Sequence, residues 1–222
     1  MLLLWLALST WLALPLAAKV PFRTVVIDPG HGGKDKGRIS SSCYYEKIYT
    51  LDVAKRLQTI LHRERIPSVM TRYADKTVSL EQRAKLANQY QNIVFVSIHF
   101  NASTDRRIRG IETYYLSRKS QKIAWQVQDA LADVTGEPDR GVKKSDFYVL
   151  RETKAPALLI ECGFLSNTKD LKLAQSPEYR QKLAQAIANG LLKYRQKFLD
   201  NKNFQASRLS ALLSGNKPLA FE

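Results

Sequence analysis

Three apolar runs in this sequence each end in a side chain that can bind a metal or transfer a proton. They lead to His31 through residues 25–30, to His99 through residues 93–98 and to Glu161 through residues 157–160. Short runs rich in Val, Ile and Leu are typical of strands that are buried on both faces of a sheet. Open α/β sheets bind ligands at the carboxyl ends of such strands. The pattern therefore predicts that the fold gathers the two histidines and the glutamate at one edge of a sheet.

Helical patterns separate the apolar runs. Apolar residues recur every three or four positions over residues 46–65, 80–90, 121–134 and 177–198, and Ser79 with Gln82 forms a capping box. We expect further strands at residues 66–72, 110–116 and 147–150, and loops at residues 38–45, 101–109 and 136–146. Strands that alternate with helices predict an α/β fold. We predict a single domain with a mostly parallel mixed sheet of about six strands, flanked by helices on both faces.

The composition fits one ordinary globular domain. The chain has 222 residues, 45% of them hydrophobic, which is enough for one substantial core. Its 35 Lys and Arg against 20 Asp and Glu give a net charge of +15, so nucleic acid, an anionic membrane surface or an acidic polymer would be attracted to it. From Asp200 onward the pattern is polar and loose, which predicts a flexible basic tail over residues 200–222.

The first 18 residues contain no charged side chain and are rich in Leu, Ala and Trp. Pro15 interrupts this stretch and Ala17-Ala18 gives it a small-residue end, as in an export signal. A stretch of this length also fits an uncleaved membrane anchor. We therefore predict that residues 1–18 form a signal peptide or an N-terminal membrane anchor. The protein is then exported to the periplasm or the cell envelope.

Cys43 and Cys162 are the only cysteines in the sequence. Cys43 lies three residues before Glu46, and Cys162 directly follows Glu161. If both glutamates face one site, the two sulfur atoms lie near each other, and an exported protein permits a disulfide. Two unpaired thiols are an equally good interpretation.

His31, His99 and Glu46, which opens the first predicted helix, form a set of two imidazoles and one carboxylate. Such a set suits zinc, and three protein ligands leave a fourth position for water, as in catalytic zinc sites. The metal lowers the pKa of its water and polarises a carbonyl oxygen. Glu161 fits a general base that takes the water proton and returns it to a leaving amine. These residues indicate a metal-dependent amide hydrolase.

The motifs follow one another in the order of a known family. They are Val-Val-Ile-Asp-Pro-Gly-His-Gly-Gly at 25–33, Glu46, Ser-Ile-His-Phe-Asn-Ala at 97–102, Gly-Ile-Glu-Thr-Tyr-Tyr at 110–115 and Leu-Ile-Glu-Cys-Gly-Phe-Leu-Ser-Asn at 159–167. This set resembles the zinc-dependent N-acetylmuramoyl-L-alanine amidases of the amidase_3 type. The resemblance covers roughly residues 24–194. It identifies residues 19–199 as an amidase_3-like catalytic domain.

The resemblance implies a peptidoglycan hydrolase that cuts the amide bond between N-acetylmuramic acid and the L-alanine of the stem peptide. It implies that His31, Glu46 and His99 are ligands of Zn2+. It also implies that Glu161 is the catalytic acid and base. The implied partner is peptidoglycan and not nucleic acid, with contact to an anionic membrane surface permitted by the charge. We expect a monomer.

Two further residues and one departure follow from the resemblance. Asn101, and Arg140 in Arg-Gly-Val-Lys, resemble supporting or substrate-facing groups of the family. Some family members carry a long insertion after the Tyr-Tyr strand that covers the zinc until an activator binds. Here only residues 116–123 separate Tyr115 from Ala124, which is too short for such a helix. We therefore expect an open site and no activator of that kind.

Two other functions remain open. A zinc or serine carboxypeptidase would act within the stem peptide, and Ser166-Asn-Thr-Lys169 matches the S-x-x-K motif of penicillin-binding enzymes, although no Lys-Thr-Gly partner is present. A non-catalytic basic protein would instead bind wall polymer, and its affinity would fall with salt but not with metal removal. The complete set of two histidines and two glutamates favours catalysis.

Overall fold

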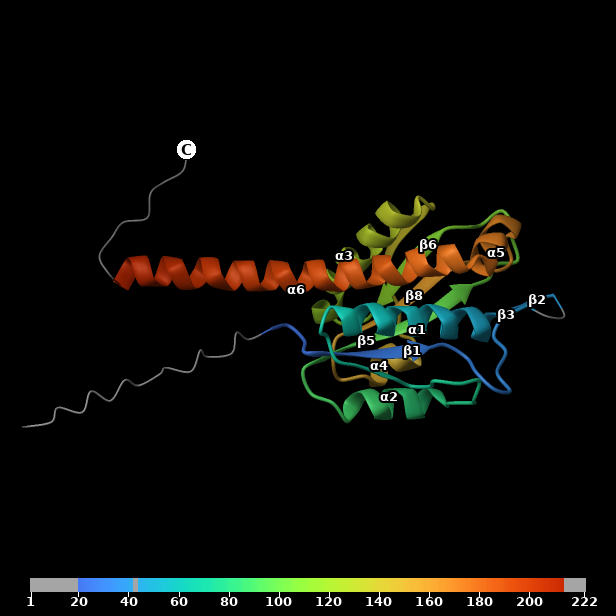
Figure 1. Ribbon diagram of the computed structural model, residues 1–222, viewed down its shortest axis with the longest axis horizontal. Coiled ribbons are helices and arrows are strands. Elements are labelled where there is room, and N and C mark those ends of the chain that lie inside the picture. Colours follow the sequence, from blue (N-terminus) through green and yellow to red (C-terminus); the bar gives the residue numbers. More distant parts are fainter. Residues whose placement is uncertain (1–19, 42–43, 214–222) are drawn as a thin grey trace, which may run out of the picture.

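A computed structural model describes residues 20–41 and 44–213 (Figure 1). Its centre is a six-stranded sheet in the order β4-β1-β5-β8-β6-β7. The strands are β1 Thr24–Pro29, β4 Ser68–Met70, β5 Ile93–Asn101, β6 Ile111–Tyr115, β7 Asp139–Lys144 and β8 Ala157–Phe164. All neighbouring pairs are parallel except β6 and β8, which are antiparallel. The prediction of a mostly parallel mixed sheet is confirmed.

Helices cover both faces of the sheet (Figure 1). The helices are α1 Glu46–Arg63, α2 Leu80–Asn88, α3 Arg118–Thr135, α4 Tyr148–Glu152, α5 Thr168–Gln175 and α6 Pro177–Leu213. Alternate strand residues separate the core into two clusters, because successive side chains of a strand point to opposite faces. Ile98 and Ile160 belong to the cluster under α1, α3 and α6, whereas Phe95 and Leu159 belong to the cluster under α2 and α4.

This alternation decides which face carries the predicted site. His99 pairs with Glu161 across β5 and β8, and Glu161 pairs with Glu112 across β8 and β6. Paired residues project from the same face, so these three side chains share the face that carries α2 and α4. His99, Glu161 and Glu112 therefore form a row across the sheet, towards the ends of β5 and β8.

Two segments differ from the prediction. Residues 139–144 of the expected 136–146 loop form the edge strand β7, since an edge strand tolerates a polar sequence such as Asp-Arg-Gly-Val-Lys-Lys. Residues 147–150 were expected as a strand, but Tyr148–Glu152 form the short helix α4. Val149 and Leu150 are both buried there against the α2 side of the core, a tertiary contact that a four-residue pattern does not encode.

The chain also differs from the prediction at β2 and in the last helix. Residues 39–41 and 44–45 pair as β2 Ile39–Ser41 and β3 Tyr44–Tyr45 within the expected loop 38–45. Helix α6, expected to end at Phe198, continues to Leu213 because no Gly or Pro interrupts residues 191–213. Part of the expected flexible tail is therefore helical, and residues 201–207 are exposed. The predicted segment 1–18 and Cys43 lie outside the described residues.

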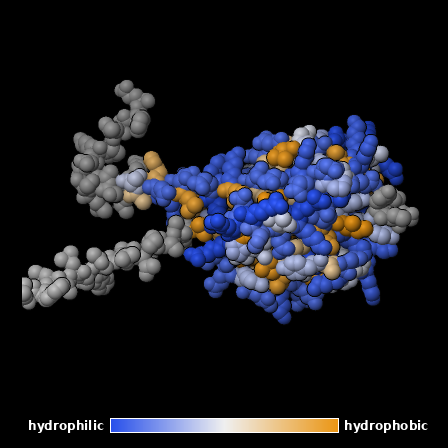
Figure 2. Space-filling model, viewed as in Figure 1, coloured by the Kyte–Doolittle hydropathy of each residue, from blue (hydrophilic) through white to orange (hydrophobic). Residues whose placement is uncertain are grey.

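The described surface and helices show no membrane-spanning feature. On the face drawn in Figure 2, hydrophilic residues predominate and apolar residues form small separate patches. None of the helices within residues 20–41 and 44–213 is long and apolar enough to cross a bilayer.

Candidate active site

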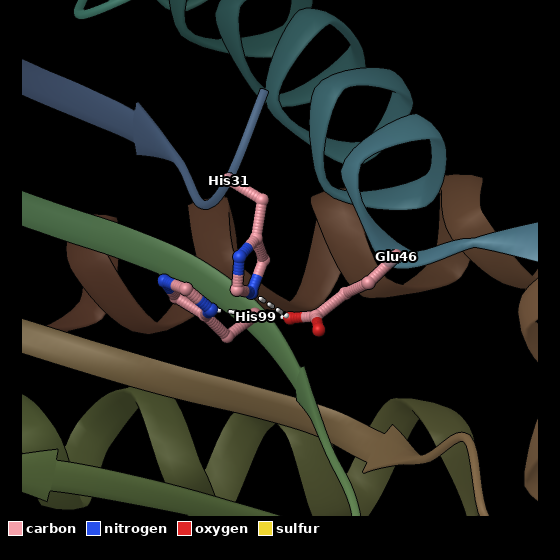
Figure 3. Close-up of side chains that lie close together, drawn as sticks. All are labelled: His31, Glu46 and His99. Atoms are coloured by element: carbon pink, nitrogen blue, oxygen red, sulfur yellow. Dashed lines mark hydrogen bonds and ion pairs between the residues drawn. The ribbon is translucent and has the colours of Figure 1, made fainter. Parts of the chain in front are cut away.

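Two histidines and a glutamate, each from a different part of the chain, converge on one point (Figure 3). The Oε1 atom of Glu46 lies 3.0 Å from His31 Nε2 and 3.1 Å from His99 Nδ1. One ligand atom from each of the three residues lies within 4.8 Å of the others. The structure thus brings together the three residues that the sequence predicted as a metal site.

Glu46 is held in place by its position at the start of α1. Its side chain is buried, and both of its oxygens accept backbone hydrogen bonds. Arg38 N donates to Oε2 at 2.9 Å, and Phe100 N donates to Oε1 at 3.0 Å. A carboxylate at the positive end of a helix is favoured by the helix dipole. The chain therefore fixes this carboxylate in its ionised form before any ligand binds.

His31 stands on a turn that few side chains could occupy. Its φ of 60° lies in the left-handed region, which non-glycine residues adopt only when their surroundings enforce it. Two buried arginines provide that constraint: Arg72 donates to the carbonyl oxygens of Pro29 and Gly30, and Arg83 donates to those of Pro29 and His31, at 2.7–3.0 Å. These contacts hold the turn so that its imidazole faces Glu46.

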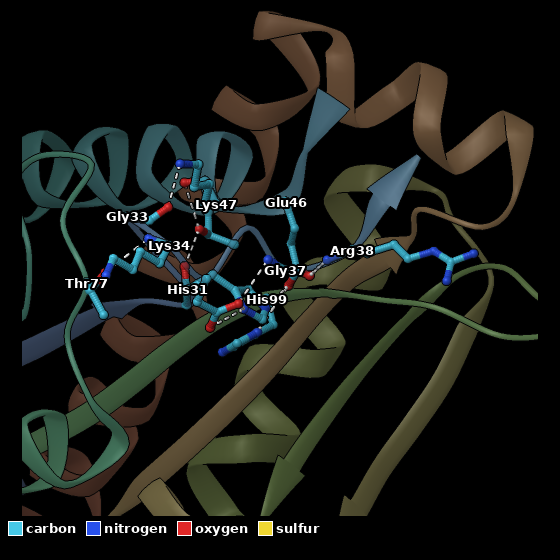
Figure 4. A network of polar contacts seen from close by, with 12 residues as sticks. His31, Gly33, Lys34, Gly37, Arg38, Glu46, Lys47, Thr77 and His99 are labelled. Carbon is cyan, nitrogen blue, oxygen red and sulfur yellow. Dashed lines mark hydrogen bonds and ion pairs between the residues drawn. The ribbon is translucent and has the colours of Figure 1, made fainter. Parts of the chain in front are cut away.

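The next part of the turn is tied to the loop before α2 and to α1 (Figure 4). Lys47 Nζ donates to Gly33 O at 2.9 Å, and Lys34 N donates to Thr77 Oγ1 at 3.0 Å. Gly37 also has to be glycine, because a Cβ there would lie 2.6 Å from Glu46 Oε2 and from His31 Cδ2. Backbone contacts thus fix the shape of the whole segment around His31.

Asp35 orients His31 from the side opposite Glu46. Both carboxylate oxygens of Asp35 lie 2.9 Å from His31 Nδ1. A carboxylate on the outer nitrogen fixes the tautomer of a metal-binding histidine and leaves the other nitrogen free to bind. This role of Asp35 was not predicted from the sequence. Its position four residues after His31 in the same glycine-rich turn was the available signal.

The charges and hydrogen bonds around Glu46 and His31 shift the pKa of each residue toward its charged form. Burial opposes the ionised form of Glu46, but hydrogen bonds from His31 and His99 outweigh it and hold the pKa of Glu46 far below its usual value. Burial also opposes charging of His31, yet Glu46 and Asp35 raise its pKa above the usual value. Two imidazoles around one anionic oxygen attract a cation, whether a proton or a metal ion.

The donor set fits a divalent metal. Two imidazole nitrogens and one carboxylate oxygen match the three protein ligands of catalytic zinc sites, and the fourth position is left for water or substrate. Gly30 makes room for this arrangement, because a Cβ there would lie 2.2 Å from the His99 ring. The three residues could therefore hold Zn2+.

Glu161 stands beside the metal-type set and forms no ion pair within residues 20–41 and 44–213. His31, Glu46, His99, Asn101 and Glu161 line one cavity of about 470 Å3. The Oε2 atom of Glu161 is buried and has no hydrogen-bond partner within the described part of the chain. Burial, and then the charges of Glu46 and Glu112, raise the pKa of Glu161 well above its usual value. This carboxyl group is suited to hold and release a proton.

Asn101 and Arg140, which the family resemblance indicated as supporting or substrate-facing groups, both form hydrogen bonds with Glu112. Asn101 Nδ2 donates to Glu112 Oε1 at 2.7 Å, and Arg140 Nε donates to Glu112 Oε2 at 2.9 Å. Glu112 is buried and pairs in register with Glu161. Glu112 lies in the motif at residues 110–115, but no role was predicted for it from the sequence. The available signal for such a role was an acidic residue, Glu112, at a strand position where an apolar residue is expected.

A family-model comparison matches residues 25–193 to the family described as N-acetylmuramoyl-L-alanine amidase. The match covers most of the chain. This chain belongs to that amidase family.

Solved structures of the amidase family share the fold. The catalytic domain of CwlV, an N-acetylmuramoyl-L-alanine amidase from Bacillus (Paenibacillus) polymyxa, is 39% identical with a TM-score of 0.75, over 78% of this chain and 98% of that chain. An N-acetylmuramoyl-L-alanine amidase from Clostridium difficile 630 is 40% identical with a TM-score of 0.75, over 78% of this chain and 97% of that one. The expected fold of the amidase family is therefore confirmed.

Curated relatives in the amidase family are longer than the matched region. The amidase LytC of Bacillus subtilis is 38% identical over 192 residues, which is 85% of this chain and 38% of LytC. The probable cell wall amidase LytH of Staphylococcus aureus is 37% identical over 174 residues, which is 78% of this chain and 58% of LytH. This chain thus spans well under two thirds of the length of these two relatives.

Proposed function

We propose that this chain is a zinc-dependent hydrolase that cleaves peptidoglycan at the amide bond between N-acetylmuramic acid and the L-alanine of the stem peptide. The proposal rests on one observation: Glu161 lines the same cavity as His31, Glu46 and His99. Membership of the amidase family and the names of its relatives support the same activity.

Each residue has a separate task in this proposal. His31, Glu46 and His99 hold Zn2+, and Asp35 keeps the proton of His31 on Nδ1. When bound there, zinc supplies the Lewis acidity that activates a water and a scissile carbonyl. Glu161 accepts the proton of the attacking water on its carboxylate and delivers it to the nitrogen of the leaving L-alanine. The raised pKa of Glu161 suits both transfers.

The proposed setting is the cell envelope. The relatives named as cell wall amidases and the apolar, uncharged residues 1–18 support export. A net charge of +15 suits an anionic wall polymer or an anionic membrane surface. Strand β6 ends at Tyr115 and α3 begins at Arg118, a connection too short for a helix that would cover the cavity. We therefore propose that the cavity is open without an activator. We also propose that the protein is a monomer.

Mass spectrometry of purified muropeptides tests the activity. We expect free stem peptide and an intact lactyl-bearing disaccharide, lost with a chelator and restored by zinc. Loss of only a terminal D-alanine would favour the carboxypeptidase alternative. No product under any metal condition would favour a binding protein. A serine mechanism has little support, since Ser166 Oγ accepts a hydrogen bond from Ser103 N in the turn before α5.

Two variants separate metal binding from proton transfer. Glu161→Gln keeps the size of the side chain but removes the acid and base, so we expect bound zinc and a loss of turnover of at least about 100-fold. His99→Ala removes a ligand, so we expect loss of both zinc and turnover. Wild-type turnover in Glu161→Gln, or stoichiometric zinc in His99→Ala, would contradict the assigned roles.

A further inference from the structure

Glu112 is the centre of a cationic cluster next to the proposed catalytic residue. Its Oε1 atom accepts hydrogen bonds from Asn101 Nδ2 and Tyr114 OH, both at 2.7 Å. Its Oε2 atom accepts hydrogen bonds from Arg140 Nε, at 2.9 Å, and from Lys143 Nζ. We call Glu112 with these four partners the Glu112 cluster. All the acceptor positions of the carboxylate are engaged within it.

The charges of the Glu112 cluster do not cancel. One buried carboxylate faces two cationic side chains, Arg140 and Lys143, which leaves one positive charge in excess. The side chain of Glu112 is 2% exposed, whereas those of Arg140 and Lys143 are 32% and 39% exposed. The negative charge is therefore hidden and the positive charge is presented to the outside. Such an arrangement suits an external anion.

The guanidinium of Arg140 is held in a fixed orientation. Its Nε atom is bonded to Glu112, and its central carbon lies 5.0 Å from the centre of the Phe164 ring. Glu112 is its only hydrogen-bond partner within the described residues. The Nη atoms, which carry four of the five donors of an arginine, are therefore available in a planar fork. A planar fork of this kind matches the two oxygens of a carboxylate.

The Glu112 cluster lies within reach of a substrate held at Glu161. Glu112 and Glu161 are paired on adjacent strands, which places them about 5 Å apart across the sheet. Asn101 belongs both to the cluster and to the lining of the cavity with Glu161. An extended peptide advances about 3.5 Å per residue. A carboxylate on the second residue after the cut is then about 7 Å from the reacting amide.

We propose that Arg140 and Lys143 bind a free carboxylate on the second residue of the stem peptide, with Glu112 fixing both cations. This inference rests on the proposed function, since it assigns a specificity subsite next to the cavity that Glu161 and Asn101 line. It makes the amidase a sensor of the charge state of its substrate. A stem peptide whose second residue is amidated would lose the ion pair while keeping its shape.

Binding of product peptides tests the inference without any need for cleavage. The two ligands are the tripeptide L-Ala-γ-D-Glu-L-Lys with a free α-carboxylate on the second residue, and the same peptide with a carboxamide there. Both have an amidated C-terminus. We expect calorimetry to show about tenfold tighter binding of the free carboxylate by the wild-type protein. Equal affinities would overturn the inference.

Three charge-removing variants show where the preference resides. Arg140→Gln and Lys143→Gln should each reduce the preference for the free carboxylate, whereas Lys144→Gln should keep it. Lys144 is the matched control, because it is the exposed neighbour on the same strand β7. Thermal melts verify that each variant is folded. A variant that weakens both peptides equally acts through structure alone and would overturn the specificity role.

Cleavage of the corresponding muropeptides separates this inference from the proposed function. We expect the amidated substrate to show a raised KM and a nearly unchanged kcat, since the carboxylate lies away from the reacting bond. A protein that prefers the free carboxylate in binding but cleaves neither muropeptide would refute the proposed function and leave the subsite standing. Equal binding with normal cleavage of both would refute the subsite alone.

Discussion

Gly30→Ala tests the geometry of the metal-type set with the smallest available change. A Cβ on residue 30 would lie 2.2 Å from Cε1, 2.3 Å from Nε2 and 2.6 Å from Nδ1 of the His99 imidazole. The φ of Gly30 is not in the left-handed region, so alanine meets no backbone strain there. The whole effect of the substitution therefore falls on the position of the His99 ring.

The size of the effect follows from these distances. Ordinary van der Waals contact begins at 3.4 Å, so the ring must retreat by about 1.2 Å. Metal sites tolerate ligand distances within about 0.2 Å of their normal values. A displacement several times larger removes His99 as a ligand. Loss of even a supporting residue costs 10–100-fold in metal affinity, and we expect at least about 100-fold here.

Zinc affinity, measured by competition with a chromogenic chelator, is the assay. Gly136→Ala is the control: no atom lies within 4 Å of the added Cβ, but its φ of 67° strains an alanine. We expect that control to lose about 1 kcal/mol of stability and to keep wild-type zinc affinity. Wild-type zinc affinity and turnover in Gly30→Ala would refute the assignment of His99 as a ligand held by this close approach.

Three further predictions concern stability and are read by urea unfolding. Arg83→Met leaves the buried Asp28 carboxylate without its charged partner, so we expect the free energy of unfolding to fall by about 3–5 kcal/mol. Adding Asp28→Asn in a double variant should restore part of this loss. An unchanged urea midpoint in Arg83→Met would contradict the ion pair. Burial raises the pKa of Asp52, but Arg56 and Arg180 outweigh this effect and hold the pKa below its usual value. The ionised form of Asp52 therefore stabilises the fold at pH values above the unfolded pKa. This contribution disappears as the pH falls through the folded pKa. Asp52→Asn should therefore cost less than about 1 kcal/mol at pH 7, and this cost should shrink as the pH falls through the folded pKa of Asp52; a cost that does not change as the solution is acidified would disprove the linkage. Ser79→Ala removes the capping box of α2 and should cost about 1 kcal/mol with no change in zinc content, whereas a loss of zinc would link this cap to the site.

The proximity of His31, Glu46 and His99 could be predicted from the sequence because local rules place each of them. His31 and His99 follow apolar strands, and parallel strands end at one edge of the sheet. Glu46 opens a helix whose apolar spacing is regular over many residues. The capping box at Ser79 was also predictable, because its hydrogen bonds are made within four residues.

The rest of the site depends on contacts that the sequence does not encode locally. Residues 139–144 read as a polar loop, and they form a strand only because β6 offers an unpaired edge to them. Arg140 therefore reaches Glu112 through a pairing across 28 residues of sequence. Arg72 and Arg83 likewise act on the turn around His31 from more than 40 residues away. Periodicity and turn chemistry carry no information about such partners.

Three neighbouring carboxyl groups take two different states because their partners differ. Glu46 lies between two imidazoles and is ionised, which suits a metal ligand. Glu112 is buried, yet hydrogen bonds from Lys143, Tyr114 and Arg140 hold its pKa below the usual value. Glu161 is buried beside these two anions and forms no ion pair within the described residues, so burial first, and then the charges of Glu46 and Glu112, raise its pKa. Environments that separate the pKa values of neighbouring carboxyl groups assign them to separate tasks. The ionisation of Glu46 and Glu112 is therefore part of what makes Glu161 able to carry a proton.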